Sequence, residues 1–429
     1  MSILKFYSFF VLKGNETMEK VRIGIFGLGR GGFAREYCSK AGNAEIVAVC
    51  DRNQTMLDRY KQYGYATYDN WDDFIKHDGL DAVVLANFAT EHAPFAIKAM
   101  KAGKHVLSEV NPFNNLKEGI ELIEAVEETG KVYAYAENYC YMPCNIEMTR
   151  LIRSGEIGNF EYGEGEYLHN CEPGWAGHTA SNPNHWRNHM YSTFYCTHSI
   201  GPLVHNSGQR PVKVTGFEVA HNDRMKRMNS ASGPIGIEMI EFENGGIGKS
   251  IHGVGVSKNS YWFCLYGSKG RAESLREATG EHQNIKFIHT NIDEYEGQNI
   301  YFNEKMYQPL PSSQMSLDAN SLGHGGGDFF TMYHFCEKIL GRENDSIDVY
   351  EAADMFLCGM FAYRSILAGG IPMRIPNLRD KAERDLWRDD TASTDAKTAG
   401  DLLLPENGRD HGELSDKIKA LLEKSAYKI

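Results

Sequence analysis

The sequence predicts an α/β protein of two domains, the first with a parallel sheet and the second with a mostly antiparallel one. Three observations support this fold class. The chain has 429 residues, more than the roughly 250–300 that one hydrophobic core holds. Up to residue 136, short β-branched runs alternate with segments of helical length, as in βαβ units. After residue 139, strand-like runs follow one another with few helices between them.

The elements follow from apolar runs bounded by glycine and polar residues. In the first domain, strands are predicted at 21–26, 44–50, 81–86, 105–107 and 131–136, with helices after the first strand and at 92–102 and 116–128. In the second, a helix near 145–154 precedes strand-like runs at 161–169, 212–219, 236–242, 246–253 and 261–266, and helices at 323–340 and 349–367 follow. A charged tail from residue 379 is expected to wrap the surface, with the apolar segment 402–404 docked.

Composition restricts the class of partner. The net charge of −12 argues against a nucleic-acid surface or an anionic membrane. No apolar run approaches the roughly 20 residues that a membrane span needs. Nine scattered cysteines without a C-x-x-C pair indicate neither a disulfide framework nor a zinc ribbon, so a reduced cytoplasmic location is expected. Residues 1–17 are expected to be an extension that precedes a fold starting near Met18.

A glycine motif predicts a dinucleotide site. Gly27, Gly29 and Gly32 satisfy G-x-G-x-x-G directly after the first strand, and Asp51 stands nineteen residues past Gly32 at the end of the second strand. This context is typical of a Rossmann domain, in which glycines let the backbone approach the pyrophosphate at a helix N-terminus. Residues 18–138 are therefore predicted to bind a nicotinamide dinucleotide. The charge of Asp51 favours NAD, whereas Arg52 beside it leaves NADP open.

The run from Gly103 to Glu109 resembles the Gfo/Idh/MocA family, the glucose–fructose oxidoreductase and inositol dehydrogenase group. Further matches are 90–92, 130–132 with 137–139, and 266–270, so the resemblance covers roughly residues 20–375. It implies an α+β second domain at 139–385 whose large open sheet often mediates oligomerisation, followed by a tail at 386–429. A homo-oligomer, dimer or tetramer, is therefore expected. Family dehydrogenases usually carry Glu-Lys-Pro here, but this chain has Val110 and Asn111 after Glu109 and no lysine.

The second half resembles the branch called glycoside hydrolase family 109. The matching stretches are Tyr195-x-Thr-His198-x-x-Gly-Pro, Glu137-Asn-x-Cys-Tyr141, Tyr167-Leu-His169, Trp186-Arg187 and Gly323-His-Gly-Gly-x-Asp328. This resemblance implies glycoside hydrolysis without net redox change. NAD⁺ oxidises the sugar at C3, which acidifies the C2–H bond, and elimination at C1, addition of water and re-reduction follow.

The resemblance also implies roles for individual residues. Tyr195 is assigned to C2 deprotonation, His198 to the C3 hydroxyl and His169 to the leaving group. A tyrosine ordinarily titrates near pH ~10, so Tyr195 needs a nearby positive charge such as Arg187 or the nicotinamide ring. The cofactor-binding candidates are Gly27, Gly29, Arg30, Gly32, Asp51, Arg52, Asn87, His92, Glu109 and Asn138, and the substrate-binding candidates are Tyr141, Trp186, Arg187 and His324.

Other interpretations stay open at this point. Glu166, His169, Cys196, His198 and His324 are residue types that bind zinc or manganese, but their spacing does not require a metal and none is predicted. The leading hypothesis is an NAD-dependent glycosidase that keeps and recycles its cofactor and acts on a sugar or glycoside. The alternatives are a net NAD-dependent sugar dehydrogenase that forms a keto-sugar and a non-catalytic dinucleotide-binding sensor.

Overall fold

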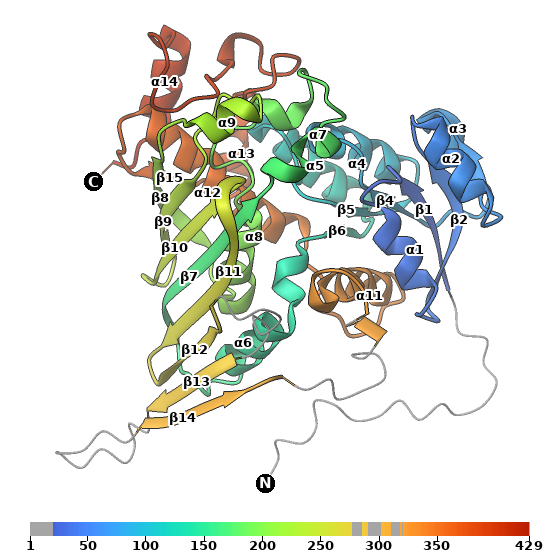
Figure 1. Ribbon diagram of the computed structural model, residues 1–429, viewed down its shortest axis with the longest axis horizontal. Helices are drawn as coiled ribbons and strands as arrows, with labels where there is room; N and C mark the ends of the chain where they lie inside the picture. Colours follow the sequence, from blue (N-terminus) through green and yellow to red (C-terminus); the bar gives the residue numbers. More distant parts are fainter. Residues whose placement is uncertain (1–19, 277–284, 291–301, 310–317, 320, 429) are drawn as a thin grey trace.

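The computed structural model describes residues 20–276, 285–290, 302–309, 318–319 and 321–428. Two sheets lie side by side, one in each domain, with helices packed against and between them (Figure 1). The predicted N-terminal extension, residues 1–17, lies outside the described residues. Within the described ranges, every helix is too short or too polar to cross a membrane.

The first sheet has six strands in the order β3-β2-β1-β4-β5-β6, and all of its pairings are parallel. The strands are β1 Val21–Phe26, β2 Ala44–Cys50, β3 Ala66–Tyr68, β4 Ala82–Leu85, β5 His105–Ser108 and β6 Tyr133–Tyr135. The helices are α1 Gly32–Cys38, α2 Gln54–Lys61, α3 Trp71–Phe74, α4 His92–Lys101 and α5 Leu116–Thr129. The predicted parallel sheet is confirmed, and its strand order reverses between β1 and β4, where such folds bind ligands. The elements β3, α2 and α3 were not predicted from the sequence.

Local chemistry explains the borders of these elements. The strands are nearly continuous apolar runs because helices cover both faces of a parallel sheet. Helix α5 begins after Asn115, whose side chain accepts a hydrogen bond from the Glu118 amide, and it ends at Gly130 in the left-handed region. Both are standard helix borders.

The second sheet has nine strands in the order β14-β13-β12-β11-β7-β10-β9-β8-β15. Only the β7–β10 pairing is parallel, so the predicted mostly antiparallel sheet is confirmed. The strands are β7 Phe160–Asn170, β8 Pro211–Glu218, β9 Gly236–Phe242, β10 Ile247–Gly253, β11 Gly255–Gly267, β12 Gly270–Ser274, β13 Ile285–Thr290, β14 Phe302–Tyr307 and β15 Met373–Arg374.

One face of this sheet packs against helices α6 Pro143–Arg153, α8 Thr197–Ser207 and α12 Val349–Leu367. Two glycines allow the closest approaches. A Cβ atom at Gly165 would lie 1.9 Å from the Ser199 carbonyl oxygen, and one at Gly216 would lie 2.2 Å from that of Ala362. The absence of side chains on β7 and β8 at these points therefore decides how deeply α8 and α12 sit.

Helix α11, Gly327–Ile339, belongs physically to the first domain although it comes late in the sequence. Its Phe329 and Phe335 share one hydrophobic core with Val21 and Ile25 of β1. This packing covers a face of the parallel sheet with a helix from the second half of the chain. The described residues therefore form two sheets linked by a common set of helices.

The tail packs back onto α5 and α12. Arg364 and Asp390 form a buried ion pair of 2.8 Å, and Leu404 is buried whereas Leu403 is exposed. The remaining short elements are η1 Ala89–Glu91, η2 Asn138–Tyr141, η3 Glu172–Gly174, α7 Trp175–His178, η4 Trp186–His189, α9 Asp223–Arg227, η5 His324–Gly326, α13 Lys381–Trp387, η6 Gly400–Leu402 and α14 Asp416–Ser425.

Candidate functional site

The candidate site lies at the carboxyl edge of the parallel sheet, where the second domain meets it. Gly27 follows β1, Asn87 follows β4, Glu109 follows β5 and Asn138 follows β6. Because the carboxyl ends of parallel strands share one edge, these residues converge there. This edge is where open α/β sheets bind their ligands.

The glycine loop fits a dinucleotide. Gly27 has φ +95°, and a Cβ atom there would lie 2.4 Å from the Ala86 carbonyl oxygen, whereas a Cβ at Gly29 would meet no atom within 4 Å. The loop is thus packed on one side and open on the other. The side-chain oxygens of Asn87 and Asn138 are buried without a hydrogen-bond partner among the described residues. A tight turn, an open helix N-terminus and unsatisfied amides suit a pyrophosphate and its riboses.

The acidic residue at the end of β2 is held ready for hydrogen bonding. The Asp51 carboxylate accepts bonds from the backbone amides of Leu28 (2.6 Å) and Asn53 (2.7 Å). A carboxylate accepts about four hydrogen bonds, so it keeps capacity for ribose hydroxyls. Its neighbour Arg52 forms an ion pair of 3.0 Å with Glu91. The guanidinium charge that would attract a 2′-phosphate is therefore already compensated.

Three predicted site residues contact Asp328, which was quoted only as part of a motif and not predicted as a site residue. Arg30 forms a bidentate contact with it at 2.6 and 3.0 Å, Asn138 donates to it at 2.8 Å, and the Nδ1 atom of His324 lies 3.0 Å away. Arg30 also contacts Glu109 at 2.7 Å. Burial alone would raise the pKa of Asp328, but the bonds from His324 and Arg30 outweigh it and hold that pKa below its usual value.

Arg30 was predicted to bind the cofactor, but in the structure it bridges two carboxylates. Its guanidinium joins β5 of the first domain, through Glu109, to α11, through Asp328. Burial also raises the pKa of Glu109, although Arg30 opposes that effect. Arg30 therefore stabilises the border of the site, while Glu109 and His324 line it on either side.

His198 is paired with a buried carboxylate. Its Nδ1 atom lies 2.7 Å from Oε1 of Glu137, and Glu137 is 0% exposed. The rings of Tyr139 and Tyr167 pack against the imidazole with centroid distances of 4.6 and 4.7 Å. In the neutral ring, the Nδ1–H group donates to Glu137, and Nε2 then carries the lone pair.

The sequence analysis did not name Glu137 as a site residue. It quoted Glu137 only as part of a matching motif, and a glutamate at the end of a strand carries no local signal of its partner. His198 is sixty-one positions away in the chain. The pairing of a motif glutamate with a motif histidine becomes visible only when β6 and α8 are packed together.

Tyr195 lies beside His198, with ring centroids 5.0 Å apart. Burial raises the pKa of its phenol, while the guanidinium groups of Arg187 and Arg30 act in the opposite direction. The Arg187 guanidinium lies 5.8 Å from the Tyr195 ring and 4.4 Å from the ring of Trp186. The cation that a phenolate at Tyr195 requires is therefore present, but burial has the larger effect on the pKa.

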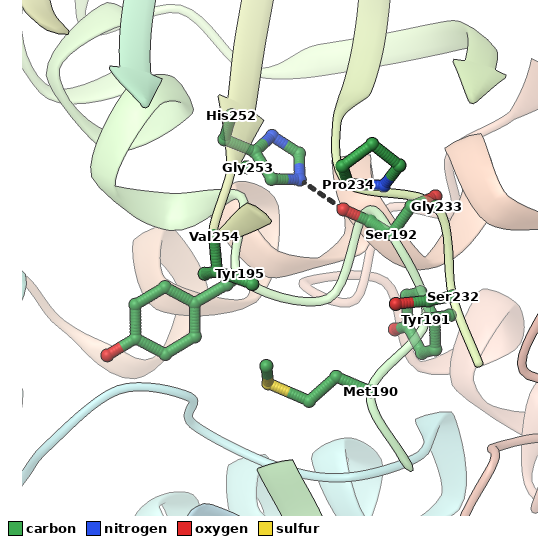
Figure 2. A pocket seen from close by; sticks show the side chains of 10 residues that line it. All are labelled: Met190, Tyr191, Ser192, Tyr195, Ser232, Gly233, Pro234, His252, Gly253 and Val254. Atoms are coloured by element: carbon green, nitrogen blue, oxygen red, sulfur yellow. Dashed lines mark hydrogen bonds between the residues drawn. The ribbon is translucent and has the colours of Figure 1, made fainter. Parts of the chain in front are cut away.

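The turn that precedes α8 presents Tyr195 and is tethered at successive residues. Thr193 donates to the Gly359 carbonyl at 2.7 Å, and the Phe194 carbonyl accepts a bond from Asn111 at 2.9 Å. The Ser192 carbonyl oxygen lies 2.9 Å from Nε2 of His252, as Figure 2 shows. The backbone of this turn is thus fixed by residues from α12, from the loop after β5 and from β10.

The third catalytic candidate, His169, stands at the end of β7. Its Nδ1 atom lies 3.1 Å from the Cys171 sulfur. Burial and the nearby imidazoles of His178, His198 and His324 lower its pKa. Tyr167 connects the three candidates, because its ring lies 4.7 Å from His198, 5.9 Å from His169 and 6.2 Å from Tyr195. The structure therefore brings the three predicted residues together around a tyrosine that was quoted only as part of a motif.

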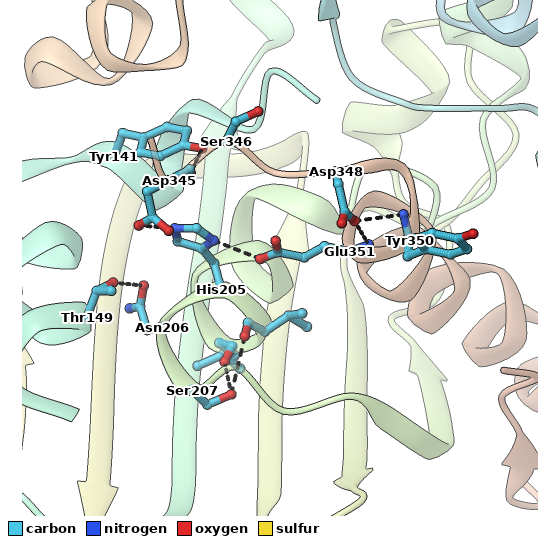
Figure 3. Close-up of polar contacts among 12 residues, drawn as sticks. Tyr141, Thr149, His205, Asn206, Ser207, Asp345, Ser346, Asp348, Tyr350 and Glu351 are labelled. Atoms are coloured by element: carbon cyan, nitrogen blue, oxygen red, sulfur yellow. Dashed lines mark hydrogen bonds and ion pairs between the residues drawn. The ribbon is translucent and has the colours of Figure 1, made fainter. Parts of the chain in front are cut away.

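The structure contradicts the substrate-binding role predicted for Tyr141. Its side chain is only 2% exposed, and its hydroxyl donates to the Asp345 carbonyl at 2.7 Å. Figure 3 shows it beside Asp345 and His205, in a cluster at the other end of α8. A buried hydroxyl that is already bonded to the backbone has no donor left for a sugar.

His92 is also placed differently from the prediction of cofactor contact. The ring is fully enclosed, with Nδ1 2.8 Å from the Asn111 carbonyl and Nε2 3.3 Å from the Asn87 carbonyl. Burial lowers the pKa of the His92 imidazole, and its bonds to these two carbonyls act in the opposite direction. His92 therefore holds the loops after β4 and β5 in place and acts on a cofactor only through them.

The residues considered for a metal do not converge. The Cys196 thiol is buried against α12, where burial raises its pKa well above the usual value, and Glu166 is paired with Arg276. Within the described part of the chain, no three histidine, cysteine or acidic residues are arranged to hold a metal ion.

Comparisons with known proteins match two separate segments of the chain to two different family models. Residues 21–137 match the model of an oxidoreductase family with an NAD-binding Rossmann fold, Gfo/Idh/MocA, and residues 260–383 match the glycosyl hydrolase 109 C-terminal domain. A glycosyl hydrolase family 109 protein from Solibacter usitatus is 26% identical over 393 residues, which cover 83% of this chain and 88% of that protein. One from Shewanella baltica is 29% identical over 204 residues, covering 43% and 44%.

Solved structures with the same fold include sugar and inositol dehydrogenases. Levoglucosan dehydrogenase in complex with NADH and levoglucosan has a TM-score of 0.67 at 18% identity, covering 83% of this chain and 100% of that one. The myo-inositol 2-dehydrogenase from Lactobacillus plantarum has a TM-score of 0.63 at 18% identity, with coverage of 83% and 100%. The chain thus combines a segment that matches the NAD-binding Rossmann fold of the Gfo/Idh/MocA oxidoreductase family with a segment that matches the glycosyl hydrolase 109 C-terminal domain.

Proposed function

We propose that the protein is an NAD-dependent glycosidase that releases the C1 substituent of a sugar through transient oxidation at C3. The observation that carries this proposal is the pairing of His198 with the buried carboxylate of Glu137 at 2.7 Å, beside Tyr195 and at the edge of the dinucleotide groove. A buried apolar residue, Val110, occupies the position after Glu109 where family dehydrogenases usually carry a lysine. The site therefore holds several proton-transfer groups but lacks that lysine.

The chain's own residues account for cofactor binding. The loop at Gly27 and Gly29 faces the pyrophosphate, and Asp51 accepts the ribose hydroxyls. Because Arg52 is paired with Glu91, Asp51 is the group that selects at the 2′ position, which favours NAD over NADP. When bound, NAD would supply a hydride acceptor for C3 of the sugar and the hydride for its later re-reduction.

His198 acts as the base for the C3 hydroxyl. With Nδ1–H donated to Glu137, its Nε2 lone pair accepts the hydroxyl proton. The Glu137 carboxylate stabilises the imidazolium that forms, since both groups are buried and 2.7 Å apart. Loss of the proton from the C3 oxygen favours oxidation at that carbon.

Tyr195 and His169 serve the elimination. A C3 ketone acidifies C2–H, and Tyr195 accepts that proton as a phenolate, which Arg187 and Arg30 favour against the effect of burial. His169 faces the departing C1 oxygen. Burial and the nearby imidazoles lower the pKa of His169, so it serves as a relay: the proton that Tyr195 takes from C2 passes through His169 to the departing oxygen, which balances the elimination.

One assay compares three functions. The protein is incubated with NAD⁺ and a panel of aryl glycosides, and aglycone release and NADH are followed together. We expect aglycone release without accumulation of NADH. Stoichiometric NADH would instead establish a net dehydrogenase, and neither signal across the panel would indicate a dinucleotide sensor.

The role of Tyr195 has its own test. In deuterated water, the wild-type protein is expected to exchange the C2 hydrogen of a bound glycoside, and Tyr195→Phe is expected to lose this exchange while keeping NAD affinity. Exchange at the wild-type rate in Tyr195→Phe would remove Tyr195 from the C2 step.

A further inference from the structure

Glu238 on β9 is a buried carboxylate without ordinary hydrogen-bond partners. It is 0% exposed, and neither carboxylate oxygen has a hydrogen-bond partner among the described residues. Among the described residues it pairs with His252 on β10, where Nδ1 lies 3.3 Å from Oε2; this is an ion-pair distance, and Nδ1 of His252 is likewise buried without a hydrogen-bond partner. An uncompensated charge in such a place is strongly destabilising, so the state of the neighbouring imidazole matters.

The other nitrogen of His252 determines where its protons are. Nε2 lies 2.9 Å from the Ser192 carbonyl oxygen (Figure 2). A carbonyl only accepts hydrogen bonds, so Nε2 must carry a hydrogen. Nδ1 then faces Glu238 either as an N–H group or as a lone pair that accepts from a protonated carboxyl. Both arrangements place one proton between the two side chains, and its removal would set a lone pair against an anion.

The contact with Ser192 reaches the active site through the backbone. Ser192 begins the turn that presents Tyr195 and leads into α8. The approach is close, because a Cβ atom at Gly236 would lie 2.8 Å from the Ser192 carbonyl oxygen and 3.1 Å from Nε2 of His252. Glycine at position 236 therefore keeps open the space in which the imidazole and the turn meet.

Two thiols and a phenol near the pair stay uncharged. The thiols of Cys196 on α8 and Cys358 on α12 face Glu238, and burial together with that carboxylate raises the pKa of both. From the turn, the phenol of Tyr191 is also buried, with its pKa raised. A cavity of about 20 Å³ borders His252, Ser192 and Tyr195, enough space for one water molecule. A second buried carboxylate, Glu218 on the neighbouring strand β8, accepts hydrogen bonds from the Gly233 and Gly408 amides.

We propose that Glu238 and His252 form a buried pair holding one shared proton, and that this pair positions Tyr195 through the Ser192 carbonyl. Neither side chain reaches the proposed substrate, so both are positioning residues. The kinetic consequence rests on the proposed function of Tyr195. The position of the proton and that of the Tyr195 ring do not depend on the proposed function and can be measured without a substrate.

Three variants of the full chain test the positioning role. Glu238→Gln donates an amide hydrogen to Nδ1 and keeps Nε2–H, so kcat stays within about threefold of wild type. His252→Leu removes the tether, and a displacement of the turn lowers kcat by up to about 100-fold, with KM changed little. The double variant Glu238→Leu/His252→Leu removes both buried polar groups and regains folding stability, yet keeps the low kcat. Recovery of kcat together with stability would show a purely structural pair and overturn the proposal.

Two spectroscopic measurements hold even if the protein hydrolyses no glycoside. In ¹⁵N-histidine-labelled protein, with the His252 signals assigned by His252→Gln, Nε2 is expected to be protonated and Nδ1 to share a proton at neutral pH. In ¹³C-tyrosine-labelled protein, the Tyr195 ring signal, assigned by Tyr195→Phe, is expected to shift in the double leucine variant but not in Glu238→Gln. A bare Nδ1 lone pair, or an unmoved Tyr195 signal, would refute the shared proton or the positioning role, respectively.

Discussion

Replacement of Glu137 by glutamine probes the pairing on which the proposed chemistry depends. Glu137 is 0% exposed and His198 is 7% exposed, so water cannot replace the lost contact. A hydrogen bond to a charged group contributes about 1.5–3 kcal/mol, which corresponds to roughly a 10- to 150-fold loss of rate.

A second effect enlarges the loss. Oε1 of Glu137 also accepts a hydrogen bond from the Tyr139 amide, which a glutamine carbonyl oxygen would keep. Where the glutamine instead presents its NH2 group to Nδ1 of His198, the imidazole proton moves to Nε2 and the base loses its lone pair. The same change of tautomer in a serine protease triad costs about 10⁴-fold. We therefore expect Glu137→Gln to lower kcat by between about 10-fold and 10⁴-fold, with a smaller effect on KM.

The assay is aglycone release as a function of pH, with thermal unfolding measured on the same samples. Glu118→Gln is the matched control, because Glu118 is a half-buried carboxylate in the first turn of α5 that accepts a hydrogen bond from the Asn114 amide, and burial raises its pKa to about 7. It should leave kcat unchanged. Wild-type kcat in Glu137→Gln, or a decrease no larger than its loss of folded protein, would show that the pairing does not serve the base.

Three further outcomes are expected. Gly27→Ala would place a Cβ atom 2.4 Å from a carbonyl oxygen at φ +95°, so we expect NAD binding measured by calorimetry to weaken at least about tenfold. Gly412→Ala, in open space, is the control and should keep the wild-type affinity. Equal affinities of the two variants would mean that the loop does not hold the cofactor. Arg187→Gln should raise the pKa of Tyr195 and move the pH–rate profile to higher pH, and an unmoved profile would speak against a phenolate. Burial opposes charge on His205, but its two carboxylate partners outweigh this and raise its pKa to about 9. The protonated imidazole stabilises the fold by on the order of 3 kcal/mol. This contribution is complete below the unfolded-state pKa of about 6.5 and disappears as the pH rises through 9. The free energy of unfolding measured with urea should therefore fall between pH 7 and 10 in the wild type but not in His205→Asn.

The predicted helices and strands that the structure confirms share a local origin. The strand at Val21–Phe26 and the glycine loop after it are specified by residues adjacent in the chain, and so is the capped helix α5. Short elements such as β3 and α3 were missed because three or four residues carry too little periodicity. Helix α8 was seen as a motif and not as a helix, since Gly201 and Pro202 inside it disfavour helix in isolation.

Some residues of the candidate site could likewise be predicted from local sequence, and others could not. Gly27, Asp51, Tyr195 and His198 could be selected from the sequence because motifs place them at the ends of predicted strands or in recognisable runs. Tyr141, also selected from a motif, lies apart from these residues, because its side chain is buried and its hydroxyl donates to the Asp345 carbonyl in the segment between α11 and α12. Membership of a motif does not decide which way a side chain faces once its segment is packed.

The sequence by itself therefore determined the parallel and antiparallel sheets and the dinucleotide loop, because hydrophobic periodicity and turn chemistry act over a few residues. Only the tertiary structure decided which partners modify the catalytic candidates. Glu137 reaches His198 across sixty-one positions, and Arg30 reaches Asp328 across two hundred and ninety-eight. The pair of Glu238 and His252 forms because β9 and β10 are adjacent strands. Such contacts depend on how sheets and helices pack, and packing is a property of the whole chain.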